Sequence, residues 1–214
     1  MGKRPNFYII IGAPGSGKGT QSQKLAKKCG IPHISSGDIL REAVQKKTPL
    51  GLEVESLVSQ GAFVSDNLIW ELVREKLSQP TCLNGCILDG FPRTVNQAIL
   101  LDGFLISKFP NYLAILLEIS EEEVLHRICS RFVCPSCNRV YSEAQGLSYC
   151  PQCNVKLVRR SDDHPEVVRE RLKIYKLSTE PVIDYYDQHH KLCKVASSGP
   201  VDEVFQKILD CIKM

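Results

Sequence analysis

The sequence has little of what membrane-spanning, nucleic-acid-binding or repeat proteins contain. No apolar run in the 214 residues approaches the length needed to cross a membrane. The formal net charge is only +3, which is too small to indicate nucleic acid as a partner. We find no internal repeat and no low-complexity tract. With 43% hydrophobic residues, the chain can build one domain with a substantial core.

We expect no targeting signal at the start of the chain. Residues 1–6 have no Ser or Thr where a myristoylation signal needs one. The apolar run at 7–11 is better explained as a strand than as part of a signal peptide. We therefore expect a cytoplasmic protein with no membrane and no nucleic acid among its partners. We also expect a monomer, because no obvious apolar patch indicates a larger assembly.

Cysteine, in contrast, is plentiful. Ten cysteines in a cytoplasmic chain are more typical of thiols or metal ligands than of disulfides. Six of them are scattered along the chain: Cys29, Cys82, Cys86, Cys129, Cys193 and Cys211.

The other four cysteines form two Cys-x-x-Cys pairs separated by twelve residues: Cys134 and Cys137, then Cys150 and Cys153. This spacing is typical of four thiolates that hold a structural Zn²⁺ in a tetrahedron. Iron in the same cage and redox chemistry at either pair are the alternatives. Between the pairs, 140–141 and 147–149 are predicted to be short strands joined through Gly146.

A glycine-rich stretch follows the first apolar run. Residues 7–11 favour a buried strand and residues 21–28 contain good helix formers. Between them the sequence is Gly12-Ala13-Pro14-Gly15-Ser16-Gly17-Lys18-Gly19-Thr20. A strand, a glycine-rich turn and a helix form the context of a phosphate-binding loop, in which backbone N–H groups surround a polyphosphate and Lys18 reaches its outer phosphates. An ordinary strand-to-helix turn is the plainer alternative.

The position after Lys18 departs from the common phosphate-loop pattern. Gly19 stands where a Ser or Thr usually binds Mg²⁺, so the metal must be held through water or another acidic group. Asp89 follows an apolar strand, at the end where parallel sheets bind ligands, and is the candidate for hydrated Mg²⁺. Arg93 comes four residues later and can bind a phosphate through two nitrogens, whereas a simple turn is the alternative.

The remaining segments predict an alternation of helices and strands. Helices from Ser36, over 50–63 and over 66–77 form either an ordinary crossover or a mobile flap over a second ligand. Arg127 and Arg131 share one face of a helix that begins near residue 120, and a solvated stripe is the alternative. A helix from Pro165 contains Arg169 and Arg171, and the two preceding acids either position arginines or make hinge contacts. A strand at 191–195 and a helix at 201–212 close the chain.

Four stretches resemble those of the bacterial adenylate kinases with a zinc-bearing lid, a branch of the nucleoside monophosphate kinases. They are 12–20, 35–38, 89–93 and 160–163, and the resemblance covers essentially the full length. It implies an α/β fold with a five-stranded parallel sheet flanked by helices. It also implies a core of 1–34, 65–130 and 165–214, a nucleoside-monophosphate flap at 35–64 and a zinc lid at 131–164.

The same resemblance implies a reaction and its site. The reaction is reversible, Mg²⁺-dependent phosphoryl transfer from ATP to AMP, giving two ADP and serving adenine nucleotide homeostasis. The implied ATP contacts are Gly15, Ser16, Gly17, Lys18, Gly19, Thr20, Arg127, Arg131, Val140, Tyr141 and Gly199. The implied AMP contacts are Ser36, Arg41, Ala62, Phe63, Val64, Gly90, Phe91, Pro92, Arg93, Gln97, Arg160 and Arg171. The groups around the transferred phosphoryl are Lys18, Asp89, Arg93, Arg131, Arg160 and Arg171.

Three other functions fit parts of the sequence. A related kinase could use GTP, or phosphorylate UMP or CMP, because base choice depends on contacts that the sequence defines poorly. A zinc-ribbon nucleic-acid binder with a phosphate-loop ATPase predicts a basic surface and salt-sensitive binding. A non-catalytic nucleotide sensor is the third, and the presence of Lys18 with five arginines argues against it.

Overall fold

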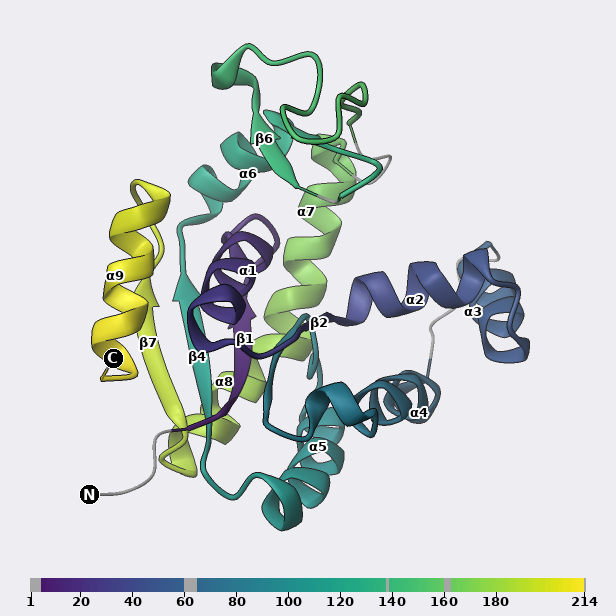
Figure 1. The fold of residues 1–214 in the computed structure, drawn as a ribbon, viewed down its shortest axis with the longest axis vertical. Coiled ribbons are helices and arrows are strands. Elements are labelled where there is room, and N and C mark those ends of the chain that lie inside the picture. The colour runs from purple at the N-terminus through teal and green to yellow at the C-terminus, as the bar shows by residue number, and fades with distance from the viewer. Residues whose placement is uncertain (1–4, 60–64, 138, 160–162, 214) are drawn as a thin grey trace.

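A five-stranded parallel sheet organises the molecule (Figure 1). The computed structural model describes residues 5–59, 65–137, 139–159 and 163–213. The strand order is β2-β3-β1-β4-β7. These strands are β1 Phe7–Gly12, β2 His33–Ser35, β3 Cys86–Asp89, β4 Tyr112–Glu118 and β7 Leu192–Ala196. The predicted fold is confirmed.

Helices cover both faces of the sheet. They are α1 Lys18–Cys29, α2 Ser36–Gln45, α3 Pro49–Ser59, α4 Asp66–Leu77, α5 Val95–Lys108, α6 Glu121–Cys129, α7 Pro165–Ile174, α8 Glu180–Gln188 and α9 Val201–Cys211. Alternate residues of β1 enter different cores, as the period of two in a strand requires. Phe7 and Ile9 pack with residues of α4, α5 and α8, whereas Tyr8 and Ile10 pack with residues of α1 and α9.

The parallel register brings the carboxyl ends of all five strands to one edge. Ser35 of β2 and Ile10 of β1 both pair with Asp89 of β3. On the other side of β1, Gly12 pairs with Leu117, and Glu118 pairs with Ala196 of β7. The loops that follow these strands therefore meet at one edge, where parallel α/β sheets bind ligands.

Two parts of the chain project from the sheet in Figure 1. Helix α2 leads away from β2 to α3, which lies far from the strands. The helix predicted over 50–63 is present as α3, and its last predicted residues fall within 60–64, outside the described residues. At the top of the view, residues after α6 form the small region that contains the cysteine pairs.

The small sheet of that region differs from the prediction. Strands β5 Arg131–Val133 and β6 Val140–Ser142 pair in antiparallel fashion. The prediction that Arg131 shares a helix with Arg127 is wrong, because α6 ends at Cys129 and Arg131 opens β5. The strand predicted at 140–141 is thus confirmed, but the strand predicted at 147–149 is wrong. Leu147 and Tyr149 are 40% and 55% exposed, and in the described region Tyr149 pairs through a single bridge with Lys156. β6 pairs with β5 instead, so 147–149 does not extend this sheet.

Two of the scattered cysteines also differ from the prediction. Cys193 of β7 and Cys211 of α9 form a disulfide with their Cα atoms 6.4 Å apart, a normal separation. The expectation of thiols is wrong for this pair because α9 packs back on β7. None of the helices in the described ranges is both long and apolar enough to cross a membrane.

Candidate active site

The loop after β1 has the shape of an anion-binding turn. Gly15 and Gly17 have φ values of 78° and 90°, and a Cβ on Gly15 would lie 2.8 Å from Ile128 Cγ1. Gly17 caps the N-terminus of α1, whose first N–H groups face this loop. The hydroxyl of Ser16 is buried and has no hydrogen-bond partner among the described residues. Such an unpaired group suits a site that a phosphate occupies.

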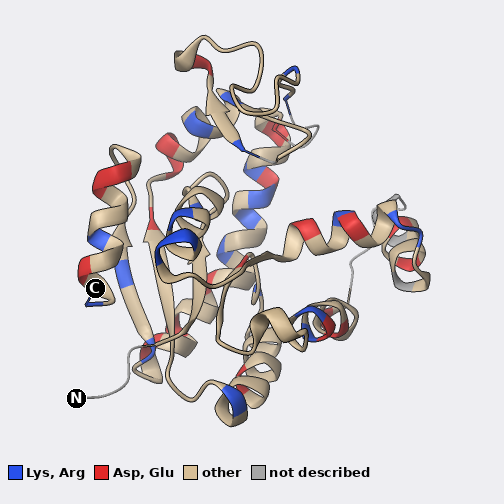
Figure 2. Ribbon diagram, in the orientation of Figure 1, with Lys and Arg blue, Asp and Glu red and all other residues tan. Residues whose placement is uncertain are grey.

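Lys18 lies across the loop, with other cations around it. Its Nζ donates to Gly12 O at 2.7 Å and to Ala13 O at 2.8 Å. The pKa of Lys18 is lowered to about 8, mainly by burial: Asp89 opposes the shift, and the positive charges of Arg93, Arg171 and Arg131 add to it. The charges of these predicted residues therefore act on Lys18 together. Figure 2 shows Lys and Arg, in blue, on both α1 and α7.

Asp89 lies beside the glycine that replaces the usual metal-binding hydroxyl. A Cβ on Gly19 would be 3.6 Å from Asp89 Oδ2, so a larger residue there would approach the carboxylate. His33 Nε2 lies 3.6 Å from the same oxygen and was not among the predicted site residues. Asp89 is 8% exposed at the end of β3, which suits a carboxylate that anchors a hydrated cation.

A buried carboxylate joins two of the predicted arginines. Arg131 Nε donates to Asp163 Oδ2 at 2.9 Å, and its Nη2 donates to Oδ1. Arg171 Nη1 of α7 lies 3.9 Å from the same Oδ1. Of the two alternatives for the acidic pair, contact with arginines is the one seen for Asp163, and Arg131 was not among the arginines considered there. Asp162 and Arg160 lie outside the described residues.

The loop after β3 connects the sheet to α2 and α5. The carbonyl of Gly90 accepts from Ser36 Oγ at 2.7 Å and from Arg93 Nε at 2.8 Å. Arg93 O accepts from Thr179 Oγ1 at 3.0 Å, and Thr179 is the last residue of the π-helical turn Tyr175–Thr179. Pro181 explains that turn, because it has no N–H to continue the α-helical pattern. Four predicted positions, Ser36, Gly90, Phe91 and Pro92, thus lie together in this loop and its neighbour.

Gln97 is held at both ends of its amide. The side chain is 2% exposed and lies in the first turn of α5. Its Oε1 accepts from Arg93 N at 2.8 Å, and its Nε2 donates to Asp66 Oδ1 at 2.6 Å. Asp66 was not a predicted site residue, because no sequence signal joins positions 66 and 97. Arg41 folds over Gly37 and donates to Asp38 Oδ1 at 2.6 Å.

Arg127 connects α6 with the loop after β7. Its Nη2 donates to Ser197 O at 2.9 Å and pairs with Glu123. A Cβ on Gly17 would lie 4.0 Å from Arg127 Nη1, so this arginine is close to the phosphate loop. Gly199, two residues beyond Ser197, is exposed and has a φ of 102°. Ala62, Phe63 and Val64 lie outside the described residues.

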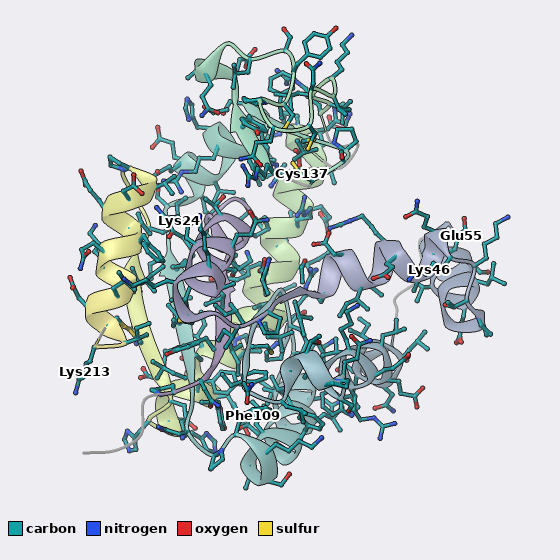
Figure 3. All side chains as sticks on the ribbon, in the orientation of Figure 1. Lys24, Lys46, Glu55, Phe109, Cys137 and Lys213 are labelled. Atoms are coloured by element: carbon teal, nitrogen blue, oxygen red, sulfur yellow. A yellow bond between two sulfur atoms is a disulfide. The ribbon has the colours of Figure 1, made fainter. Side chains whose placement is uncertain are left out.

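The four paired cysteines lie together, as predicted. The Sγ atoms of Cys134, Cys137, Cys150 and Cys153 are all within 4.8 Å of one another. Cys137 and Cys150 have their sulfurs 3.8 Å apart. A tetrahedron with Zn–S bonds of about 2.3 Å has S–S edges of about 3.8 Å, so this spacing suits a bound zinc. Figure 3 shows Cys137 with other sulfur atoms of the cluster beside it.

Tyr141, a predicted ATP contact, lies against this cluster. Its hydroxyl is 3.2 Å from Cys150 Sγ, and its ring packs with the buried cysteines and Leu157. The neighbouring Val140 is 44% exposed. The tyrosine side chain is therefore part of the cysteine cluster, which leaves the backbone and the exposed side chains of Val140 and Ser142 as the groups of β6 that face outward.

Comparisons with known proteins agree with this geometry. A family model described as adenylate kinase matches residues 10–191. The adenylate kinase of Chlamydia pneumoniae is 55% identical over 207 residues, which cover 97% of each chain. The adenylate kinase of Chlamydia caviae is 53% identical over 206 residues, or 96% of each chain. That of Chlamydia trachomatis serovar D is 52% identical over 99% of this chain and 92% of the relative. The chain therefore belongs to the adenylate kinase family of phosphotransferases.

Proposed function

We propose that the chain catalyses reversible phosphoryl transfer between ATP and AMP to give two ADP, with Mg²⁺ bound to the nucleotide. The observation that supports this most directly is the convergence of Lys18 with Arg93, Arg131 and Arg171 at a phosphate-binding loop. Such a set of cations suits a substrate pair that brings several phosphate groups to one place. Membership in the adenylate kinase family supports the choice of adenine nucleotides.

The mechanism needs positioning and charge neutralisation rather than a general base. The transferred phosphoryl group passes through a loose transition state with negative charge on its outer oxygens. Lys18, Arg93, Arg131 and Arg171 stabilise that charge, and the AMP phosphate is already an anionic nucleophile. Asp89 would hold hydrated Mg²⁺, and that metal would supply further neutralisation of the phosphates of ATP. We propose the same neutralising role for Arg160 from the sequence motif alone.

Donor and acceptor occupy opposite sides of this cation cluster in the proposal. ATP lies on the phosphate loop and α1, with its base near Arg127, Gly199 and the outward groups of β6. AMP lies between α2 and the loop after β3. Its proposed contacts are Ser36, Arg41, Ala62, Phe63, Val64, Gly90, Phe91, Pro92, Arg93, Gln97, Arg160 and Arg171. Those at 62–64 and 160 rest on the sequence alone.

We also propose that two projecting segments close over the substrates. Residues 35–64 would form the monophosphate flap and residues 131–164 the lid, on a core of 1–34, 65–130 and 165–214. Closure excludes water, which otherwise competes with AMP as the acceptor. The projection of α3 and of the cysteine region from the sheet supports this division (Figure 1).

The cysteine cluster would stiffen the lid by holding Zn²⁺. The lid has a core of only a few buried residues, among them Cys134, Cys150 and Leu157. A small unit of this kind gains most of its stability from a metal. Four thiolates leave no open position for catalysis, so the role is structural. Iron in the same cage is the alternative, and metal analysis of the purified protein distinguishes the two.

A panel of acceptors tests the proposal. ADP formation is measured with ATP and AMP, GMP, UMP or CMP, then with GTP in place of ATP, and the protein's oligomeric state is determined on the same sample. Strong turnover with ATP and AMP is expected, from a monomer that contains about one zinc. Preference for another monophosphate, or for GTP, would contradict the base assignment. No turnover with any acceptor would contradict the proposed function and favour the nucleic-acid-binding alternative.

A further inference from the structure

The amide of Gln97 is fixed by two partners of opposite kind. The backbone N–H of Arg93 donates to Oε1 at 2.8 Å, and Nε2 donates to Asp66 Oδ1 at 2.6 Å. Asp66 in turn accepts from Thr94 Oγ1 at 2.7 Å and from Asn96 Nδ2 at 3.3 Å. Its carboxylate is therefore held by side chains of the same loop and helix that present Gln97.

These partners leave the amide one orientation. A backbone N–H can only donate, and a carboxylate can only accept. If the amide of Gln97 turned over, its NH₂ would face the N–H of Arg93 and its oxygen would face the carboxylate of Asp66. Both contacts would be repulsive, and with Gln97 only 2% exposed, water could not relieve them.

The fixed amide can distinguish two classes of base. An amide has two donor and two acceptor positions, so Gln97 keeps one of each for a ligand after it bonds to Arg93 and Asp66. A 6-amino purine presents an acceptor at N1 and a donor at its amino group. A 6-oxo purine presents a donor at N1 and an acceptor at O6. One orientation of the amide matches the first base and the reverse orientation matches the second.

Helix α4 holds Asp66 firmly at this place. Asp66 is the first residue of α4, and the side chain of Ser65 caps the helix by accepting from Leu68 N at 3.3 Å. Trp70 of the same helix stacks on Phe91, with ring centroids 6.0 Å apart. The element that orients Gln97 is therefore packed on the loop that contains Arg93.

We infer that Asp66 is a positioning residue that sets the preference of the acceptor site for a 6-amino purine over a 6-oxo purine. It acts by fixing the Gln97 amide and does not itself touch the substrate. This inference rests on the proposed function, in which the base of AMP lies against Gln97. It assigns to α4, at the boundary of the proposed flap, a role in choosing the base.

The test compares AMP with inosine monophosphate, its 6-oxo counterpart. In Asp66→Ala one of the two constraints on the amide is absent, so its reversal becomes less costly. The ratio of kcat/KM for AMP to that for inosine monophosphate should fall by about tenfold. Asp66→Asn keeps the shape of the side chain and one acceptor oxygen, so the ratio should fall by less. Asn96→Ala is the matched control, since Asn96 contacts Asp66 but not Gln97, and its ratio should equal that of the unaltered enzyme.

A purely structural role for Asp66 would lower turnover of both substrates alike and leave the ratio unchanged. An unchanged ratio would overturn the inference if it is found in either Asp66 variant and that variant has a melting temperature close to that of the unaltered enzyme. If Asp66→Ala does not fold, the ratio measured in Asp66→Asn decides. Failure of the unaltered enzyme to use AMP would contradict the proposed function itself, and is seen before any variant is made.

Discussion

Arg131 and Asp163 join the two ends of the proposed lid. Arg131 opens β5, Asp163 precedes α7, and the guanidinium donates from Nε to the carboxylate at 2.9 Å. Asp163 is only 8% exposed and also lies near Arg171. A single carboxylate therefore sets the position of two arginines that belong to different elements.

The first prediction concerns this carboxylate. Asp163→Asn removes the charge that holds Arg131 and Arg171, and it leaves both arginines less well placed for the phosphoryl group. We expect kcat to fall by about tenfold or more, because the misplacement of catalytic groups slows the chemical step more than it weakens substrate binding. Steady-state ADP formation measures this. Asp187→Asn, an exposed carboxylate paired with Lys194, is the control and should leave kcat unchanged.

The second prediction concerns protons taken up with the nucleotide. In the free enzyme the pKa of Lys18 is about 8, so at pH 9 most of Lys18 is neutral. A bound polyphosphate favours the charged form and raises this pKa, so binding at pH 9 should take up close to one proton. At pH 6.5 Lys18 is already charged, and its contribution should vanish.

Calorimetry of ATP binding in buffers with different ionisation enthalpies measures that uptake. In the unaltered enzyme Lys18 makes proton uptake larger at pH 9 than at pH 6.5, and Lys18→Met should abolish this difference in uptake. Equal uptake at both pH values, or the same uptake in the variant, would show that Lys18 is not the group that titrates.

The third prediction separates the metal from the chemistry. Cys150→Ser removes one ligand of the cluster, and a chelator removes the metal from the unaltered enzyme. Both should lower the melting temperature by several degrees, since metal binding stabilises the fold. Below the melting transition kcat should change far less than in a variant of Lys18. Cys129→Ser, outside the cluster, should retain its metal and its melting temperature.

Much of the fold and site followed from local sequence patterns. The apolar run before Gly12 and the one before Asp89 predicted strands, and the parallel register then placed both residues at one edge. The two cysteine pairs predicted a cluster because tetrahedral ligation requires such spacing.

Other features depend on contacts between distant segments. Asp66 and Gln97 are 31 residues apart, and only the packing of α4 on α5 and its preceding loop joins them. The same holds for Cys193 and Cys211, which meet because α9 returns along β7. The strand predicted at 147–149 failed for a related reason, since β5 pairs with β6 and leaves those residues without a ladder.

The turnover of Lys18→Met tests the central claim most directly, with Lys24→Met as the matched control on the same helix. Lys24 pairs with Asp202 away from the cation cluster, so its variant should keep the kcat of the unaltered enzyme. Removing Lys18 should lower kcat for ADP formation from ATP and AMP by about a hundred- to a thousandfold. A folded Lys18→Met enzyme with kcat within a few-fold of the unaltered one would contradict the account that these converging cations perform the transfer.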